Sequence, residues 1–414
     1  MNRVFSELTS TFLVDNRDIF NIIPSKSTWF ILLGTLLVFY LVLVMSAAHS
    51  ISMQRNLTYL QWTKLWRRPA LLKDLRYQGL SINTRNIQCG TSDGITLHGY
   101  HMMPARLTAA IASFQVTQKG KNTKRAALDE FFDAHLADAK GVVLYIHGIA
   151  LDRAFHYRIA TMVNLANQFD VHVIAFDYRG FAENEGSSEL SESGTRCDAR
   201  AMEAWLDAAI KRGRLHARTY GLCTQKNVER PIRIIYGHSL GSSVSTYLAG
   251  DNSILGHFDG IILNGAFTCA VDAMKCSRLG APLRWLHPCV MDYVASKWTL
   301  VTEGYRTIQY IERVPNSMHV LFIHGEKDAV IPFHLGKELY EKWRSLRAAY
   351  ESRRGAAVAS MEFVAIADAM HSDNFKFAQW TVGIYDFLAR IERDRHSVGV
   401  NLHGDERMVA STSR

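Results

Sequence analysis

Residues 237–241 read GHSLG, which is the pattern of a sharp strand-to-helix turn that presents a serine. An apolar, strand-like run at 232–236 precedes the turn, and a helical pattern follows it from Ser242. Glycines on both sides remove side chains that would clash in so tight a turn. The pattern predicts Ser239 as a catalytic nucleophile, and the alternative is a glycine-rich turn with an inert serine.

A serine hydroxyl attacks only when a base removes its proton, and with this turn the acid and the histidine follow the serine along the chain. His371 comes after a strand-like run at 362–366 and is the predicted general base. Asp328 ends the loop after the run at 319–323, where a carboxylate can hold the imidazole tautomer. Glu326 in the same loop is the alternative acid.

Acyl transfer also needs N–H donors aimed at the oxyanion of the tetrahedral intermediate. Leu240, the residue after the nucleophile, is one predicted donor. The other comes from the loop after an earlier strand, where Ile149 is the candidate and Ala150 the alternative if the loop is shifted by one residue. This chemistry needs no metal and no cofactor, and the sequence contains no HxxEH-like zinc spacing.

Around these residues, β-rich apolar runs alternate with helical patterns. The runs lie at 142–147, 171–176, 232–236, 260–263, 319–323 and 362–366. This alternation predicts an α/β fold with a doubly wound, mostly parallel sheet. Runs at 82–90 and 95–103 flank an Asp-Gly turn and predict an opening β-hairpin. Segments 105–140 and 213–230 have the composition of surface insertions.

Residues 29–48 contain no Asp, Glu, Lys or Arg and would span roughly 30 Å as a helix. They predict a single transmembrane anchor, with a cleaved signal peptide as the alternative. More basic residues closely follow this stretch than precede it, which favours a cytosolic catalytic domain. The glycosylation sequon at Asn56 favours a lumenal one.

The rest of the chain is assigned around the anchor. The expected parts are an N-terminal tail at 1–28, an amphipathic juxtamembrane segment at 49–81, a catalytic domain at 82–395 and a disordered tail at 396–414. Within the catalytic domain, 267–317 is longer than a connection requires and is rich in apolar side chains, which predicts a lid over an apolar pocket. An ordinary helical excursion is the alternative.

Net charge and cysteine content indicate which ligands and which covalent cross-links the chain could have. The formal charge of +8 suits an anionic membrane surface. There is no zinc-finger spacing, RNP motif or long basic run, so nucleic-acid binding is not expected. The six cysteines form no CxxC pair, although Cys276 and Cys289 could pair in an oxidising lumen. The sequence indicates no particular protein partner.

Five motifs together resemble the membrane-anchored serine hydrolases of the α/β-hydrolase fold, in the branch of lysophosphatidylserine lipase and monoacylglycerol lipase, which is akin to Bem46-like proteins. They are HG at 147–148, FDYRGF at 176–181, GHSLG at 237–241, VIPFHLG at 330–336 and HSD at 371–373. The resemblance covers about 82–392. It implies a single-pass enzyme of the endoplasmic-reticulum membrane that hydrolyses acyl esters of single-chain glycerolipids, either monoacylglycerol or lysophospholipid, lysophosphatidylserine included.

The chain departs from the family pattern at two loops. Ile149 and Leu151 stand where the family reads HGNAG, and Ala182 follows Phe181 where a glycine is usual. Leu151 adopts glycine-like dihedrals only at a steric cost. Two alternatives therefore remain beside the lipase, namely a protein depalmitoylating thioesterase, which uses the same triad, and a pseudoenzyme that serves as an interaction module.

Overall fold

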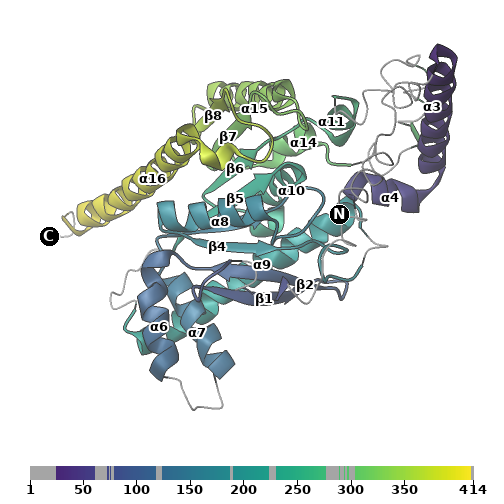
Figure 1. Cartoon of the computed structure of the whole chain (residues 1–414). Helices are drawn as coiled ribbons and strands as arrows, with labels where there is room; N and C mark the ends of the chain where they lie inside the picture. The colour runs from purple at the N-terminus through teal and green to yellow at the C-terminus, as the bar shows by residue number, and fades with distance from the viewer. Residues whose placement is uncertain are drawn as a thin grey trace, which may run out of the picture.

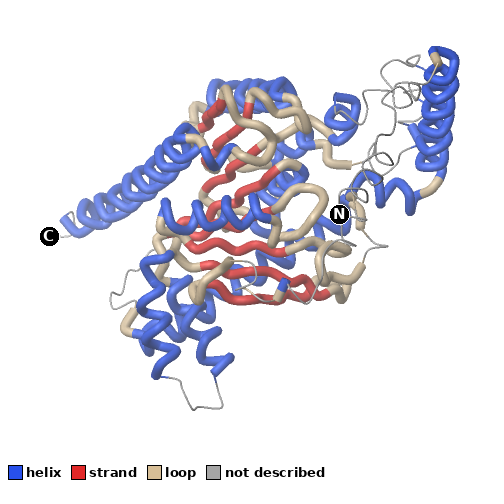
Figure 2. The backbone as a smooth tube through the Cα atoms, in the orientation of Figure 1, coloured by secondary structure: helices blue, strands red, loops and turns tan. Residues whose placement is uncertain are grey.

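An eight-stranded sheet forms the centre of the molecule (Figure 2). The computed structural model describes residues 25–60, 72–73, 75, 79–117, 124–186, 190–222, 230–276, 289, 293, 296–297 and 304–411. The strands are β1 (Thr84–Gly90), β2 (Thr96–Met102), β3 (Gly141–Ile146), β4 (His172–Phe176), β5 (Ile232–His238), β6 (Gly260–Asn264), β7 (His319–Gly325) and β8 (Met361–Ile366). Every run predicted as a strand is a strand in the structure.

The strand order is β1-β2-β4-β3-β5-β6-β7-β8. β1 and β2 form the predicted antiparallel hairpin, and β2 pairs antiparallel with β4. All other neighbours are parallel. The predicted doubly wound, mostly parallel sheet is confirmed. Because parallel strands end at the same edge, the loops after β3, β5, β7 and β8 meet there.

Helices cover both faces of this sheet (Figure 1). One face carries α8 (His156–Phe169) and α16 (Ala378–Ser411), and the other carries α9 (Glu192–His216), α10 (Leu240–Ala249) and α15 (Phe333–Arg354). Strands β3 to β7 are therefore buried along their whole length. A strand covered on both faces is apolar throughout rather than alternating, which is why the sequence shows these strands as continuous runs.

The segment at 105–140 is a packed helical unit. It forms α6 (Thr108–Thr117) and α7 (Lys124–Ala137), and α7 lies along α9. Met103, Ile111, Phe131 and Phe132 make a small apolar cluster between these helices, apart from the two cores of the sheet. The insertion thus extends the β1–β2 end of the molecule (Figure 1).

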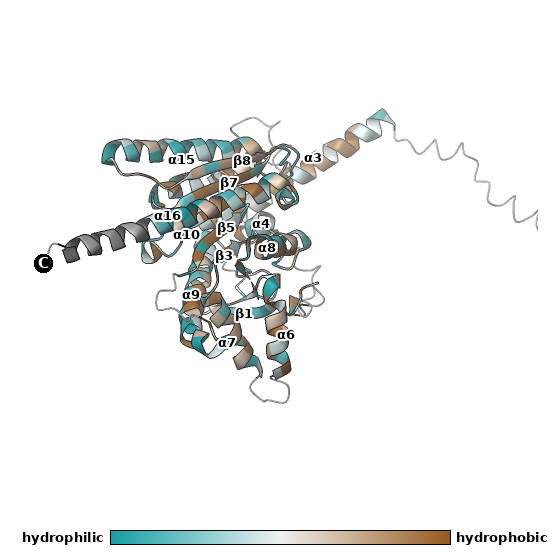
Figure 3. Ribbon diagram, turned by 90° about the vertical axis from the view of Figure 1, so that its left-hand side faces the viewer, coloured by the Kyte–Doolittle hydropathy of each residue, from teal (hydrophilic) through white to brown (hydrophobic). Residues whose placement is uncertain are grey.

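Helix α3 (Lys26–His49) projects from the body and is apolar over most of its length (Figure 3). Its segment Lys26–Ser46 is long and apolar enough to cross a membrane, and only 6% of its most apolar window is buried. This segment contains most of the predicted anchor. A signal sequence near the N-terminus meets the same criteria of length and composition, so the helix fits a transmembrane anchor and a cleaved signal peptide alike.

A short helix, α4 (Ile51–Tyr59), follows α3 and is docked on the body. The fully buried Tyr59 hydroxyl lies 2.9 Å from the hydroxyl of Tyr305, which lies 3.0 Å from Thr195 Oγ1 in α9. Arg55 Nε also donates to the carbonyl of Leu190 at 3.2 Å. Contacts of α4 therefore join the apolar helix to the body of the molecule.

Several expectations need correction or fall outside the described residues. α16 continues to Ser411, so the chain beyond 396 is helical where a disordered tail is expected, because an established helix adds further residues readily. Cys276 is a free thiol, so it forms no disulfide with Cys289. The middle of the predicted lid, between 276 and 304, is largely outside the described part, as is most of 61–81, while the ends of the predicted lid form α11 (Ala270–Cys276) and α14 (Thr307–Tyr310). In 213–230, α9 runs to His216 and a 3₁₀ turn (Ala217–Tyr220) follows, so the start of this segment is helical rather than loop.

Candidate active site

Ser239 lies in a strained turn between β5 and α10. Its backbone has φ 55° and ψ −123°, a combination that side chains rarely tolerate. Its N–H donates to the carbonyl of Asn264 at 2.9 Å, which ties the turn to the end of β6. A Cβ on Gly237 would lie only 2.5 Å from the carbonyl oxygen of Gly241, so the turn requires glycine there. The local sequence therefore folds into the turn that its motif predicts.

His371 and Asp328 lie together at the same edge of the sheet, after β8 and β7. His371 Nδ1 donates to Asp328 Oδ2 at 2.7 Å, and this leaves the lone pair on Nε2. The other oxygen, Asp328 Oδ1, accepts the N–H groups of Val330 and Ile331 at 2.8 Å each. Glu326, the alternative acid, is exposed. The structure brings His371 to Asp328 and not to Glu326.

Asp328 is held as an anion. Burial raises the pKa of its carboxyl, but hydrogen bonds from His324 and His371 outweigh burial and leave the pKa well below the ordinary value. His324 Nε2 lies 3.5 Å from Asp328 Oδ2 and donates to the carbonyl of Ile331 at 2.9 Å. Sequence reasoning did not find this role for His324, because its position inside β7 resembles that of an ordinary core residue.

His238, the residue before the nucleophile, holds the loop of His371. Its Nε2 donates to the backbone carbonyl of His371 at 2.9 Å. Burial first, and the nearby His371 second, lower the pKa of His238 to about 3, so its ring is neutral. No hydrogen bond joins Ser239 Oγ to His371 Nε2, both of which the structure describes. Such bonds often form only when substrate binds.

A buried polar network lies beneath the site. Tyr236 Oη accepts hydrogen bonds from Asn264 Nδ2 at 2.7 Å and from Trp380 Nε1 at 3.2 Å. Asn264 Oδ1 in turn accepts from Asn374 Nδ2 at 2.9 Å. These four residues join β5, β6, α16 and the loop that carries His371. The sequence gives no signal for this network, since its hydrogen-bonded partners are 28 to 144 residues apart.

The loop after β3 passes directly beside Ser239. A Cβ on Gly148 would lie 2.9 Å from the Cβ of Ser239, so only glycine permits this approach. Ala150 and Leu151 follow with φ of 62° and 57°, in the left-handed region. Among the described residues, no hydrogen-bond partner occupies the N–H of Ile149, the predicted oxyanion donor. The N–H of Leu240, at the start of α10, has none there either.

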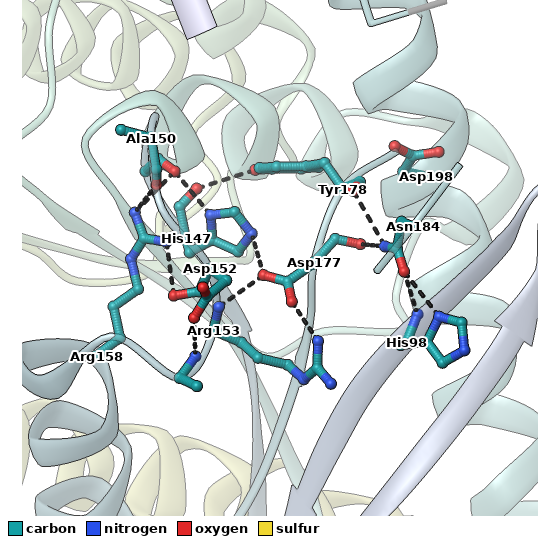
Figure 4. Close-up of polar contacts among 12 residues, drawn as sticks. His98, His147, Ala150, Asp152, Arg153, Arg158, Asp177, Tyr178, Asn184 and Asp198 are labelled. Atoms are coloured by element: carbon teal, nitrogen blue, oxygen red, sulfur yellow. Dashed lines mark hydrogen bonds and ion pairs between the residues drawn. The ribbon is translucent and has the colours of Figure 1, made fainter. Parts of the chain in front are cut away.

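A polar cluster supports the same loop (Figure 4). Asp177 accepts a hydrogen bond from the backbone N–H of Arg153 at 2.7 Å and forms a buried ion pair with its guanidinium. His147 Nε2 lies 3.1 Å from Asp177 Oδ1. Burial raises the pKa of Asp177, but Arg153 and His147 outweigh it and lower the pKa to about 2. Asp177 of the FDYRGF motif therefore anchors both ends of the loop after β3.

A groove of about 850 Å³ opens beside His371. Its surface is mostly apolar, with two lysines and two histidines among the side chains around it. The lining residues are His156, Tyr157, Ala160, Lys327, Ala329, Val330, Met370, His371, Ser372, Asp373, Phe375 and Lys376. Small-molecule sites commonly have volumes of roughly 300–1,000 Å³ and mostly apolar walls. The groove is suited to an apolar ligand that reaches the imidazole.

One group of side chains in the described part of the chain has a spacing that could hold a metal, and it consists of Glu203, Asp207 and His257. Arg233 already pairs with this group. Its Nη2 lies 2.7 Å from Glu203 Oε1 and its Nη1 lies 3.1 Å from Asp207 Oδ1. Because the acidic charge is compensated by Arg233, the group is better explained as an ion-pair network.

Comparison with known proteins agrees with this geometry. Residues 143–397 match the model of the alpha/beta hydrolase family. The lysophosphatidylserine lipase ABHD12 of Danio rerio is 26% identical over 340 residues, which cover 81% of this chain and 77% of that protein. The same lipase of Mus musculus is 24% identical over 378 residues, covering 89% and 83%.

An esterase of Pyrococcus furiosus aligns in structure with a TM-score of 0.48 and 14% identity, over 76% of this chain and 93% of the esterase. The family model spans more than half of the 414 residues. It includes the strand ends that carry Ser239, Asp328 and His371. The chain belongs to the alpha/beta hydrolase family.

Proposed function

We propose that this protein is a membrane-anchored serine hydrolase that cleaves acyl esters of single-chain glycerolipids, either monoacylglycerol or lysophospholipid. In the proposed mechanism Ser239 is the nucleophile, His371 the general base and Asp328 the acid that orients it. Ile149 and Leu240 supply the oxyanion N–H groups. The observation that carries the proposal is the 2.7 Å bond between His371 and Asp328 beside the strained turn of Ser239.

The chemistry follows from this arrangement. Ser239 Oγ attacks the ester carbonyl carbon while His371 Nε2 takes its proton, and Asp328 stabilises the imidazolium. The tetrahedral intermediate collapses when its C–O bond to the glycerol backbone breaks, and His371 protonates the departing alcohol. Water then attacks the acyl-enzyme by the same route and releases the fatty acid. No step requires a metal.

The substrate class rests on three observations. The groove at His371 has mostly apolar walls, as an acyl chain requires. Helix α3 has the length and composition to hold the enzyme at a bilayer, where single-chain lipids are found. The relatives from Danio rerio and Mus musculus are named lysophosphatidylserine lipases. Location in the endoplasmic-reticulum membrane is part of the proposal and is checked by cell fractionation.

Active-site labelling tests whether the serine is activated. Membranes that contain the wild-type chain are treated with a fluorophosphonate probe beside Ser239→Ala and Ser242→Ala at matched expression. Ser242 lies in the first turn of α10 and is fully buried, and among the described residues its hydroxyl has no hydrogen-bond partner. We expect label on the wild type and on Ser242→Ala but not on Ser239→Ala. A folded wild type that takes up no label would indicate a pseudoenzyme.

A substrate comparison then tests the ester class. The solubilised full-length enzyme is given monoacylglycerol, lysophosphatidylserine, lysophosphatidylcholine and an S-palmitoyl peptide, and released fatty acid is measured. Hydrolysis of a single-chain glycerolipid that is lost in Ser239→Ala supports the proposal. Activity on the thioester alone would favour the depalmitoylase and contradict the glycerolipid assignment.

A further inference from the structure

Arg158, in the first turn of α8, is a fully buried cation that points at the oxyanion loop (Figure 4). Its Nη2 donates to three consecutive backbone carbonyls, those of Gly148 at 3.1 Å, Ile149 at 3.1 Å and Ala150 at 2.8 Å. Its Nη1 donates to the carbonyl of Asp152 at 3.0 Å. One guanidinium group therefore donates hydrogen bonds to nearly every backbone carbonyl of the 148–152 loop.

These bonds determine where the N–H groups of the loop point. In a trans peptide the N–H lies opposite the carbonyl of the preceding residue, and the described chain contains no cis bond. With the carbonyls of Gly148 and Ile149 facing Arg158, the N–H groups of Ile149 and Ala150 face away from it. Gly148 lies against Ser239, so the loop whose N–H groups are oriented in this way begins beside the proposed nucleophile.

The loop needs such support because its backbone is unfavourable by itself. Ala150 and Leu151 are consecutive non-glycine residues with positive φ, and left-handed backbone crowds a Cβ against the neighbouring carbonyl. Turning three carbonyls toward one point also makes them repel one another. A cation at that point removes the repulsion, and the planar guanidinium has enough donors to satisfy all of them.

The surroundings of Arg158 agree with this role. Among the described residues no carboxylate forms an ion pair with it, although its side chain is completely buried. Its hydrogen-bond partners are carbonyl oxygens of the loop, and its guanidinium lies 5.5 Å from the ring centre of Tyr157. The backbone oxygens of one loop therefore solvate this buried charge.

We infer that Arg158 is a positioning residue that shapes the oxyanion hole by holding the carbonyls of the 148–152 loop. This inference rests on the proposed function, since an oxyanion hole has meaning only in a working hydrolase. Arg158 touches neither substrate nor nucleophile in this role. It acts through the backbone, so its loss should weaken binding of the transition state far more than binding of the substrate.

Arg347 provides a matched control. It is also a buried arginine, and it donates to the carbonyls of Ala359 at 2.9 Å, Met318 at 2.6 Å and Pro315 at 3.4 Å. These carbonyls belong to the segments at the beginnings of β7 and β8, at the opposite edge of the sheet from the site. Arg347 therefore matches Arg158 in burial and in bonding to backbone oxygens, but not in location.

The experiment uses the solubilised full-length protein with p-nitrophenyl butyrate as the probe ester. Values of kcat and KM, and the rate of fluorophosphonate labelling, are measured for wild type, Arg158→Lys, Arg158→Ala and Arg347→Lys. Lysine keeps the charge but is a point donor that cannot serve four carbonyls at once. We expect both Arg158 variants to lose about 10²–10³-fold in kcat, as for removal of an oxyanion donor, with KM nearly unchanged. Arg347→Lys should keep its kcat.

Chemical rescue separates positioning from general stability. Millimolar guanidinium should restore part of the kcat of Arg158→Ala in a saturable way, while equal sodium chloride should not. A kcat that stays at the wild-type level in Arg158→Lys and Arg158→Ala would overturn the inference. So would a loss shared equally by Arg347→Lys, or failure of every Arg158 variant to fold. A folded wild type that neither labels nor hydrolyses the ester contradicts the proposed function itself, and with it the role of Arg158.

Discussion

The rings of His238 and His371 lie 4.8 Å apart, and the side chain of the first donates to the backbone of the second. The residue beside the proposed nucleophile therefore fixes the loop that carries the proposed general base. This contact joins the turn after β5 to the loop after β8 across two intervening strands. It couples the position of Ser239 to that of His371 without a direct bond between them.

Replacing His238 should slow catalysis without preventing folding. His238→Phe removes the donor to the carbonyl of His371 and frees the loop, and a displacement of about 1 Å in such a site can cost around 10²-fold in rate. His238→Gln keeps an N–H donor and should lose less. Steady-state kcat of the two variants on the same ester is the measurement. Equal kcat values for His238→Phe and His238→Gln would show that the hydrogen bond from His238 to the carbonyl of His371 has no positioning role.

Asp328→Asn should nearly abolish turnover. An amide in place of the carboxylate favours the wrong imidazole tautomer and cannot stabilise the imidazolium, and such a change costs about 10⁴-fold in kcat in serine hydrolases with this triad. Glu326→Gln is the control, because Glu326 is exposed and the structure places Asp328, not Glu326, at His371. If Glu326→Gln proved the more damaging change, the assignment of the acid would be wrong.

The network under the site should contribute to stability. Tyr236→Phe removes the hydroxyl that accepts from Asn264 and Trp380, leaving buried donors without partners at a cost of about 1–3 kcal/mol. Tyr145 stacks on Tyr236 with ring centres 5.4 Å apart, and no hydrogen bond of its hydroxyl is found in the described part of the chain. Tyr145→Phe is therefore the control and should cost little. Thermal unfolding of both variants checks the difference.

A pair of buried histidines should make the fold sensitive to acid. His101 Nε2 lies 3.0 Å from His172 Nδ1, and Arg85 Nη2 lies 3.0 Å from His101 Nδ1. Burial first lowers the pKa of both rings, for His172 to about 3 and for His101 well below the ordinary 6.5. Arg85 lowers both further. Both imidazoles are therefore neutral in the folded protein at neutral pH.

The direction of the pH effect follows from this difference. Below about pH 6.5 the unfolded chain takes up protons that the folded chain does not. The free energy of unfolding therefore decreases as the pH is lowered from about 6.5 to about 3. Each such histidine contributes at most about 1.4 kcal/mol per pH unit. The melting temperature measured from pH 7.5 to 5 should drop less in His172→Gln than in wild type. His156→Gln, at an exposed position, should leave the slope unchanged.

The sequence predicted the sheet and the sharp turn at Ser239 because both depend on short-range patterns. Buried parallel strands appear as continuous apolar runs, and the turn at Ser239 is specified by five consecutive residues. The choice between Asp328 and Glu326 stayed open, since two carboxyls in one loop are distinguished only by the direction of their side chains. The network of Tyr236, Asn264 and Trp380 depends on tertiary contacts between distant segments, which no local pattern reports.

The oxyanion loop shows a further reason for the limits of sequence reasoning. The leucine at position 151 predicts a steric cost, and the structure indeed places both Ala150 and Leu151 at positive φ. What the sequence does not reveal is the compensation, which comes from Arg158, seven residues later and on a helix. A local departure from a family pattern therefore says little about activity until the partner of the altered segment is known.

The ends of three strands, β5, β7 and β8, supply the proposed nucleophile, acid and base. β8 ends at Ile366 and His371 follows it, whereas Ser239 lies 132 residues earlier. During synthesis the serine turn emerges from the ribosome long before the base does, and the base takes its place only when the last strand joins the sheet edge. Hydrolysis should therefore begin only after β8 has joined the sheet, so that nascent chains and fragments that end before His371 are inert toward the lipids around them.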